Sequence, residues 1–198
     1  MTYNPDIHHR HSIRLKDYDY SRAGAYFVTL CAWQRECLFG EIANGEMVLN
    51  DFGRVVRGEW EKTPRMRITV ELDVYSIMPN HFHAIFFIHD IPVGAHCMRP
   101  ESDAMIQRQP QAHLQMRAHV SAPLRRQSCS IGSIVAGFKS ASTKRINIIR
   151  NNPGSPVWQR NYYERVIRDD NELVRAREYI VSNPLKWALD QKNPLNCR

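Results

Sequence analysis

Residues 78–88 read Met-Pro-Asn-His-Phe-His-Ala-Ile-Phe-Phe-Ile, a Pro-Asn turn followed by strand-forming residues that begin with two histidines. In a β-strand the side chains of residues i and i+2 project from the same face of the sheet. His81 and His83 would therefore stand side by side, while Phe82 turns to the opposite, packed face. Two imidazoles at this spacing can share one metal ion, although a strand can also carry such a pair for structural reasons alone.

The segment before the turn predicts a partner strand. Residues 67–78 alternate apolar and polar side chains, so we expect an antiparallel hairpin with the two histidines at its turn end. Residues 24–33 and 157–167 are rich in β-branched and aromatic side chains and predict two further strands. Asn44-Gly45 predicts the turn of an additional short hairpin.

Helices are expected between and after these strands. The first is predicted over residues 50–62, the second over residues 131–149, and the third over residues 169–190, where Asp169 and Glu172 form a capping box. The element order β-α-β-β-α-β-α is that of an α+β fold, a ferredoxin-like split βαβ antiparallel sheet, with one additional C-terminal helix. The other face of the sheet would be free for a ligand or for that last helix.

Composition and charge narrow the class of protein. The chain has 198 residues, of which 43% are hydrophobic and 24% charged, as expected for one folded domain. Its net charge of +7 favours an anionic partner, with nucleic acid first. Residues 1–23 predict a polar N-terminal arm, and residues 91–129 predict a poorly ordered insert. Five scattered cysteines and the lack of a long apolar run predict a cytoplasmic protein that does not enter the membrane.

The last helix supplies a second group of polar side chains. Tyr179 and Asn183 are four residues apart and are neighbours on one helix face, which we expect to turn away from Ile180 and Val181. Asn183 offers a neutral oxygen to a divalent cation, and the Tyr179 hydroxyl is a candidate nucleophile. A phenol needs assistance at neutral pH, which a bound Mg²⁺ or Mn²⁺ provides by polarising a phosphate. Pro184 predicts a kink at Asn183.

In these motifs the chain resembles the REP-associated tyrosine transposases of bacteria, which are single-tyrosine HUH transposases. The resemblance covers nearly all of the chain outside the insert, and the order of the motifs makes it specific. The matching segments are Ser-Ile-Arg-Leu-Lys-Asp-Tyr-Asp-Tyr at 12–20, Met-Pro-Asn-His-Phe-His at 78–83, residues 132–147, Val-Trp-Gln-Arg-Asn-Tyr-Tyr-Glu at 157–164, and Glu-Tyr-Ile-Val-Ser-Asn-Pro at 178–184.

The resemblance implies a role for each site residue. His81 and His83 would bind a catalytic divalent metal ion, Mg²⁺ or Mn²⁺, with Asn183 as the third ligand and Tyr179 as the nucleophile. The implied reaction is cleavage of single-stranded DNA at the foot of an imperfect hairpin, which leaves a 5′-phosphotyrosyl link and a free 3′-hydroxyl. Strand rejoining is the reverse reaction, so no nucleotide cofactor is expected. The family resemblance is compatible with a monomer or a homodimer.

Basic side chains are expected to contact the phosphates of the DNA, with aromatic faces for unpaired bases. A solvated helix face would explain any one of these residues equally well. Arg165 stands where many members of the family carry histidine, and it could hold the scissile phosphate instead. The predicted DNA-binding residues are Arg14, Lys16, Lys139, Lys144, Arg145, Arg160, Arg165 and Arg168.

Two alternatives to the transposase remain open at this point. One is a catalytically weak or inactive protein that binds hairpin DNA, and the other is a ferredoxin-like RNA-binding module. The RNA-binding module would explain the charge and the aromatic residues, but not the histidine pair and the tyrosine helix together. Tyr162 and Tyr163 compete with Tyr179 as nucleophiles, yet they lie on a predicted strand, so we interpret them as core or base-stacking residues.

Overall fold

The computed structural model describes residues 18–90 and 130–196. The predicted insert at 91–129 lies outside these ranges, as do most of the predicted N-terminal arm and its two predicted DNA-binding residues, Arg14 and Lys16.

One antiparallel sheet of four strands, in the order β4-β5-β1-β6, forms the centre of the fold. β1 spans Gly24–Cys31, β4 spans Val70–Ile77, β5 spans His81–Ile88 and β6 spans Tyr163–Ile167. Both β1 and β4 pair antiparallel with β5, so they run in the same direction with β5 between them. This is the split βαβ arrangement, and it confirms the predicted ferredoxin-like α+β fold.

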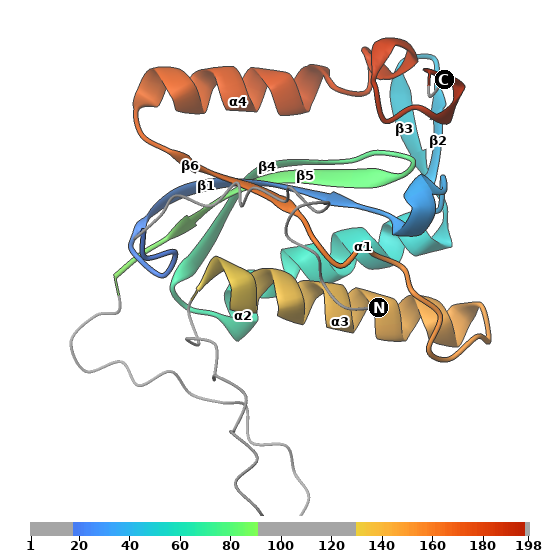
Figure 1. The fold of residues 1–198 in the computed structure, drawn as a ribbon, viewed down its shortest axis with the longest axis horizontal. Coiled ribbons are helices and arrows are strands. Elements are labelled where there is room, and N and C mark those ends of the chain that lie inside the picture. The colour runs from blue at the N-terminus through green and yellow to red at the C-terminus, as the bar shows by residue number, and fades with distance from the viewer. Residues whose placement is uncertain (1–17, 91–129, 197–198) are drawn as a thin grey trace, which may run out of the picture.

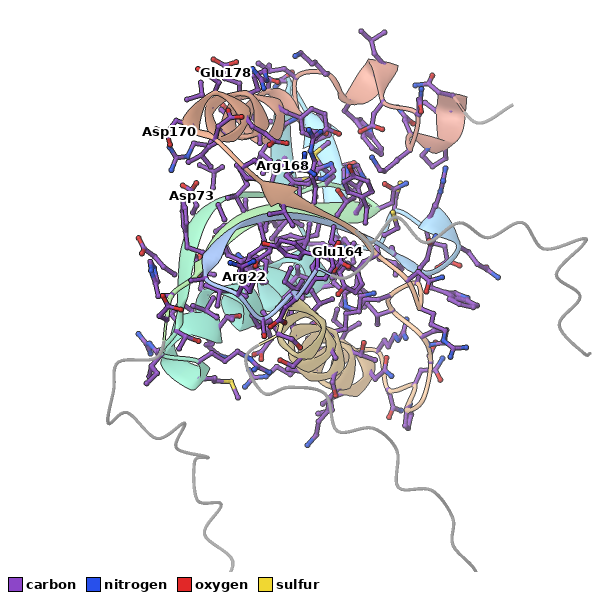
Figure 2. The ribbon with its side chains drawn as sticks, turned by 60° about the vertical axis from the view of Figure 1, so that its left-hand side comes forward. Arg22, Asp73, Glu164, Arg168, Asp170 and Glu178 are labelled. Atoms are coloured by element: carbon purple, nitrogen blue, oxygen red, sulfur yellow. The ribbon has the colours of Figure 1, made fainter. Side chains whose placement is uncertain are left out.

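Helices cover both faces of the sheet (Figure 1). α1 (Asp51–Glu61) and α3 (Ile131–Ile149) lie on one face, and α4 (Asp170–Ser182) lies along the opposite face. Asp170 and Glu178 are exposed on the solvent side of α4 (Figure 2). None of the helices in the two described ranges is long and apolar enough to cross a membrane.

Smaller elements connect these layers. β2 (Gly40–Ala43) and β3 (Glu46–Leu49) form the predicted short hairpin, and its turn residues Asn44 and Gly45 have φ angles of 53° and 80°. Two successive positive φ angles define a type I′ turn, which Asn-Gly adopts most readily. α2 (Thr63–Met66) is a single short helical turn, and three 3₁₀ turns also occur in the described ranges. These 3₁₀ turns span Trp33–Arg35, Trp187–Leu189 and Pro194–Asn196.

Polar caps determine where the three long helices begin. The side chains of Asn50, Ser130 and Asp169 each accept a hydrogen bond from the backbone N–H three residues later, at 3.0, 3.3 and 2.7 Å. Glu172 Oε2 accepts from the N–H of Arg168, one residue before the cap. The predicted capping box of α4 is therefore present in a modified form.

The fourth predicted strand is shorter than expected. β6 begins only at Tyr163. Before it, Trp158 forms an isolated antiparallel bridge with Ala32. The side chain of Trp158 points into the core, where its indole Nε1 donates a hydrogen bond to Ser142 Oγ at 2.9 Å. Backbone hydrogen bonds from Trp33 N–H to the Val157 carbonyl and from Gln159 N–H to the Cys31 carbonyl flank the bridge, so pairing is present here but short.

The last predicted helix is also shorter, because it ends at Ser182 and not at residue 190. Pro184 has no backbone N–H to continue the helical hydrogen bonds. Ile180 is fully buried, as predicted, but Val181 is 68% exposed, so the prediction that it faces inward is wrong. The side of α4 that faces the sheet therefore includes Ile180 but not Val181.

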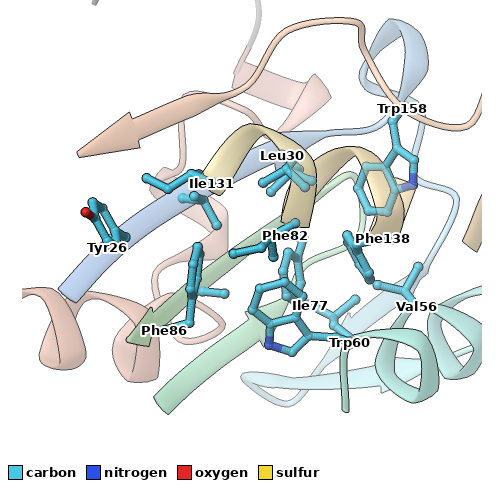
Figure 3. Close-up of a cluster of buried hydrophobic side chains, with 14 of the residues drawn as sticks. Tyr26, Leu30, Val56, Trp60, Ile77, Phe82, Phe86, Ile131, Phe138 and Trp158 are labelled. Atoms are coloured by element: carbon cyan, nitrogen blue, oxygen red, sulfur yellow. The ribbon is translucent and has the colours of Figure 1, made fainter. Parts of the chain in front are cut away.

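The main core lies between the sheet and the helices α1 and α3 (Figure 3). Trp60 of α1 is fully buried, and the centroid of its ring is 5.1, 5.7 and 5.2 Å from those of Phe82, Phe86 and Phe138. Because Phe82 points into this core, the residues on either side of it point to the opposite face of the sheet. That face carries a second, smaller cluster under α4, made of Phe27, Ile85, Ile167 and Ile180.

Replacing Trp60 by Ala should lower the free energy of unfolding by about 3–5 kcal/mol, because it leaves a cavity among three aromatic rings. Trp60→Phe is the matched control. It keeps the aromatic contacts and removes Nε1, which has no hydrogen-bond partner within the described ranges, so it should cost under about 1.5 kcal/mol. Urea unfolding followed by circular dichroism measures both values, and an alanine variant as stable as wild type would contradict this packing.

Candidate active site

The two histidines lie under α4, on the face of the sheet opposite the main core. His81 is 0% and His83 is 1% exposed, and their ring centroids are 4.6 Å apart. Pairing between β5 and β1 sets His81 opposite Cys31 and His83 opposite Thr29. The strand alternation thus brings the two imidazoles side by side in a buried position.

Asn80, the last residue of the turn before β5, fixes the orientation of the first imidazole. Its Nδ2 donates to the carbonyl oxygens of Arg35 and Lys192, at 3.0 and 2.6 Å. The amide oxygen therefore faces His81 Nδ1, 2.8 Å away, and accepts a hydrogen bond from it. His81 Nδ1 consequently carries the proton, and Nε2 presents its lone pair to the site.

His83 is held in a similar way and points toward α4. Its Nδ1 lies 2.7 Å from Thr29 Oγ1, and its Nε2 lies 3.4 Å from the hydroxyl oxygen of Tyr179. Phe27 packs against both rings, with centroid separations of 5.6 Å to His83 and 6.1 Å to Tyr179. Tyr179 is 43% exposed, so its hydroxyl lies between the buried histidines and solvent.

Both imidazoles are held in the neutral form. Burial lowers the pKa of His81 to about 2, and electrostatic interactions with His83, Lys192 and Arg35 contribute. Burial, together with the charge of Lys192, lowers the pKa of His83 to about 3. Neutral imidazole is the form that binds metal ions. The same lysine and arginine give the site a positive potential that suits a phosphate.

Asn183 directly follows the last residue of α4 and is 4% exposed. Its φ and ψ angles of −62° and −43° are helical, so the kink predicted at this residue is not found there. Its Oδ1 is buried and has no hydrogen-bond partner in the part of the chain that the structure describes. Tyr179 and Asn183 line one open cleft of about 300 Å³, together with Lys186, Asp190 and Lys192.

These residues suit a divalent cation. His81 Nε2 and Asn183 Oδ1 are both buried polar atoms without a partner among the described residues. Together with His83 Nε2 they make two nitrogen donors and one hard oxygen donor, a set compatible with Mg²⁺ or Mn²⁺. Within residues 18–90 and 130–196 no group of three His, Cys, Asp or Glu side chains could hold a metal ion. As the side chains lie in this structure, the third donor beside the two imidazoles is therefore the amide oxygen of Asn183.

The predicted basic residues are divided between the two faces of the sheet. Lys139, Lys144 and Arg145 belong to α3, which lies across the sheet from the α4 residue Tyr179 (Figure 1). Lys139 Nζ donates to two backbone carbonyl groups, and burial lowers its pKa to about 8. Arg145 Nε pairs with Glu59 at 2.8 Å. The structure therefore does not bring these three side chains to the histidines.

Three other basic residues lie on or next to β6. Arg165 lines a second cleft, of about 220 Å³, beside Tyr179, and its guanidinium pairs with Glu172. Arg168 is exposed in the short link between β6 and α4 (Figure 2). Arg160 is exposed on the segment that precedes β6. Of the predicted DNA-binding residues that the structure describes, Arg165 therefore lines a cleft with Tyr179.

The competing tyrosines lie further from the histidines. Tyr162 packs against the main core, with Lys139 Nζ 5.3 Å from its ring centroid. Tyr163 is 44% exposed on β6, and β1 separates that strand from His83 on β5. Tyr179 is the tyrosine whose hydroxyl reaches an imidazole of the pair, among the residues described.

Sequence reasoning missed four residues that support or face the histidines: Thr29, Asn80, Asp190 and Lys192. Thr29 is a polar residue in the middle of an otherwise apolar strand, and that signal could have identified it. In the sequence, Asn80 was recognisable only as part of the predicted Pro-Asn turn, and nothing indicated that it contacts His81. Asp190 and Lys192 lie after the last helix, in a stretch without any periodic pattern, so their position depends on tertiary contacts alone.

The chain was compared with known proteins. No family model matches it. A protein of Haemophilus influenzae whose function is uncharacterized is 43% identical over 189 residues, which cover 96% of each chain. Among solved structures, a REP-associated tyrosine transposase bound to a REP hairpin aligns over 88% of this chain and 74% of that chain, with a TM-score of 0.53 and 18% identity. The chain therefore belongs to the same family as the Haemophilus influenzae protein and has the fold of a REP-associated tyrosine transposase.

Proposed function

We propose that this protein is a transposase of the tyrosine HUH type, a metal-dependent endonuclease and strand transferase that acts on single-stranded DNA at the foot of REP-like hairpins. The main support is the meeting of a buried imidazole pair with an exposed tyrosine, since His83 Nε2 and the Tyr179 hydroxyl are 3.4 Å apart. A hydroxyl nucleophile beside a cation site can attack a phosphate that the site holds in place. The shared fold with a transposase that binds a REP hairpin supports DNA as the substrate.

In this proposal His81, His83 and Asn183 hold Mg²⁺ or Mn²⁺. The bound ion would polarise the scissile phosphate and stabilise the charge that develops on it. The Tyr179 oxygen attacks phosphorus, the bond from phosphorus to the 3′-oxygen breaks, and that oxygen takes a proton from water to become the free 3′-hydroxyl. The phenol proton passes to water, because this side chain is 43% exposed. The product is a 5′-phosphotyrosyl link, and reversal of the step rejoins the strand without a nucleotide cofactor.

The DNA backbone is proposed to cross the α4 side of the sheet. Lys192 lies close enough to both histidines, and Arg35 to His81, to lower the pKa values of the imidazoles, and these positive charges would attract a phosphate. Arg165 borders the cleft beside Tyr179 and would contact the neighbouring phosphate. Trp33 is 40% exposed in the same 3₁₀ turn as Arg35 and offers a ring face to an unpaired base.

Incubation of a labelled single-stranded hairpin with the protein tests the proposal. In Mn²⁺ or Mg²⁺ we expect a covalent protein–DNA adduct on a denaturing gel and a shortened strand with a free 3′-hydroxyl. EDTA should prevent both, and a fully paired duplex of the same sequence should not be cut. Hairpin binding without an adduct in either ion would favour the inactive hairpin-binding protein, and tighter binding to single-stranded RNA would favour the RNA-binding module.

A further inference from the structure

Asp190 faces the histidine pair from the segment that follows α4. Its Oδ2 lies 3.7 Å from His81 Nε2, and its side chain is 11% exposed. It directly follows the 3₁₀ turn Trp187–Leu189 and lines the same cleft as Tyr179 and Asn183. A carboxylate thus approaches the proposed metal site from an element that the three predicted ligands do not use.

The two facing atoms are both hydrogen-bond acceptors. His81 donates a hydrogen bond from Nδ1–H to Asn80 Oδ1 at 2.8 Å, so its Nε2 carries a lone pair. Asp190 Oδ2 carries negative charge, and His81 Nε2 has no hydrogen-bond partner among the described residues. A buried acceptor and a largely covered carboxylate that face each other are unfavourable without a proton or a cation between them. A divalent cation would satisfy both.

The position of the carboxylate separates a metal ligand from a supporting residue. A carboxylate that supports a metal-bound histidine accepts a hydrogen bond from the imidazole nitrogen that points away from the metal. Asn80 already occupies that nitrogen of His81, and Asp190 faces the opposite one. Ligand atoms about 2.1 Å from a shared ion lie about 3.0–3.4 Å apart at right or tetrahedral angles. The observed 3.7 Å is therefore within a short adjustment of shared coordination.

The backbone around Asp190 is held in place before any ion binds. The Lys192 N–H donates to Asp190 Oδ1 at 2.7 Å, and the Lys192 carbonyl accepts from Asn80 at 2.6 Å. The ring of Trp187 lies 6.0 Å from that of His81, centroid to centroid. One carboxylate oxygen is thus used to order the loop, which leaves the other for the cation.

We infer that Asp190 is a further protein ligand of the divalent ion at the histidine pair, an inference that rests on the metal site of the proposed function. A carboxylate beside two imidazoles and an amide oxygen gives the site a negative ligand, which strengthens the binding of hard cations such as Mg²⁺ and Mn²⁺.

Mn²⁺ binding tests this role without any measurement of cleavage. Electron paramagnetic resonance of free Mn²⁺ gives the dissociation constant, and the rise in Tm on adding Mn²⁺ gives a second readout. Asp190→Asn keeps an oxygen to accept from Lys192, so its Tm without metal should match wild type. Its dissociation constant should rise by about 10-fold or more. Asp170→Asn, which changes an exposed acid on α4 (Figure 2), should bind Mn²⁺ as wild type does.

The outcomes separate this inference from the proposal beneath it. If wild type binds Mn²⁺, His81→Ala does not, and Asp190→Asn binds as tightly as wild type, Asp190 is no ligand while the metal site stands. A lower Tm without metal, combined with unchanged Mn²⁺ affinity, would make Asp190 a structural residue only. If wild type itself binds no Mn²⁺, both the metal site and this inference are wrong.

Discussion

Tyr179→Phe should abolish the covalent adduct and lower the rate of hairpin cleavage by at least about 10³-fold, because it removes the proposed nucleophile. The substitution deletes the one oxygen that lies 3.4 Å from His83 Nε2 and keeps the ring. The ring contacts with Phe27 and His83, at 6.1 and 5.2 Å between centroids, do not involve that oxygen. We therefore expect hairpin affinity, measured by fluorescence anisotropy, to stay within about threefold of wild type.

Tyr163→Phe is the matched control for this experiment. It removes the hydroxyl of Tyr163, which is 44% exposed where Tyr179 is 43% exposed. Both tyrosines line the same cleft. It should leave adduct formation close to wild type. An adduct that persists in Tyr179→Phe and disappears in Tyr163→Phe would move the nucleophile to β6, and mass spectrometry of the DNA-linked peptide would identify the tyrosine directly.

His83→Ala should reduce cleavage by about 10²–10⁴-fold and weaken Mn²⁺ binding by about 10-fold or more, because the site loses one of two nitrogen ligands. The side chain is 1% exposed and bonds to Thr29, so the variant leaves a small cavity. Urea unfolding shows whether the fold survives this loss. Hairpin affinity in EDTA should remain, since binding depends on the basic surface and not on the imidazole.

His89→Ala serves as the control for the loss of a histidine. His89 directly follows β5, its ring is exposed, and it pairs with Glu71 at 2.7 Å, at the end of the strand away from the turn. Cleavage and Mn²⁺ affinity should both be unchanged in this variant. Unchanged cleavage in His83→Ala as well would show that the reaction does not use the imidazole pair, and the metal-dependent mechanism would then be wrong.

The sheet and its helices were predictable because their signals are local. Alternation along residues 78–88 assigns the histidines and Phe82 to opposite faces, and burial of Phe82 in the main core agrees with it. The cap residues Asn50, Ser130 and Asp169 mark helix starts that the structure reproduces. Side-chain hydrogen bonds to the nearest backbone need no tertiary information, so a sequence reveals them well.

The features that depend on tertiary contacts were not predictable. The indole of Trp158 donates to Ser142 on α3, a partner that the local pattern of residues 157–167 does not indicate. Lys139 bonds to backbone carbonyl groups of the segment before β6, a contact that its predicted role at DNA did not include. Asp190 reaches His81 across more than a hundred residues of sequence, in a stretch without periodic pattern. Each of these positions is set by a partner that the sequence does not place nearby.

Asn80 joins parts of the chain that are made at very different times during synthesis. Its side chain binds the carbonyl groups of Arg35 and Lys192, so the support of His81 is complete only once residue 192 has been made. While residue 192 is still inside the ribosome, the sheet can form but this contact is missing. A product truncated before Asp190 would likewise keep the tyrosine and the histidines but lack the segment that covers them. The histidine pair therefore gains its full support only late in synthesis, after residue 192 has left the ribosome.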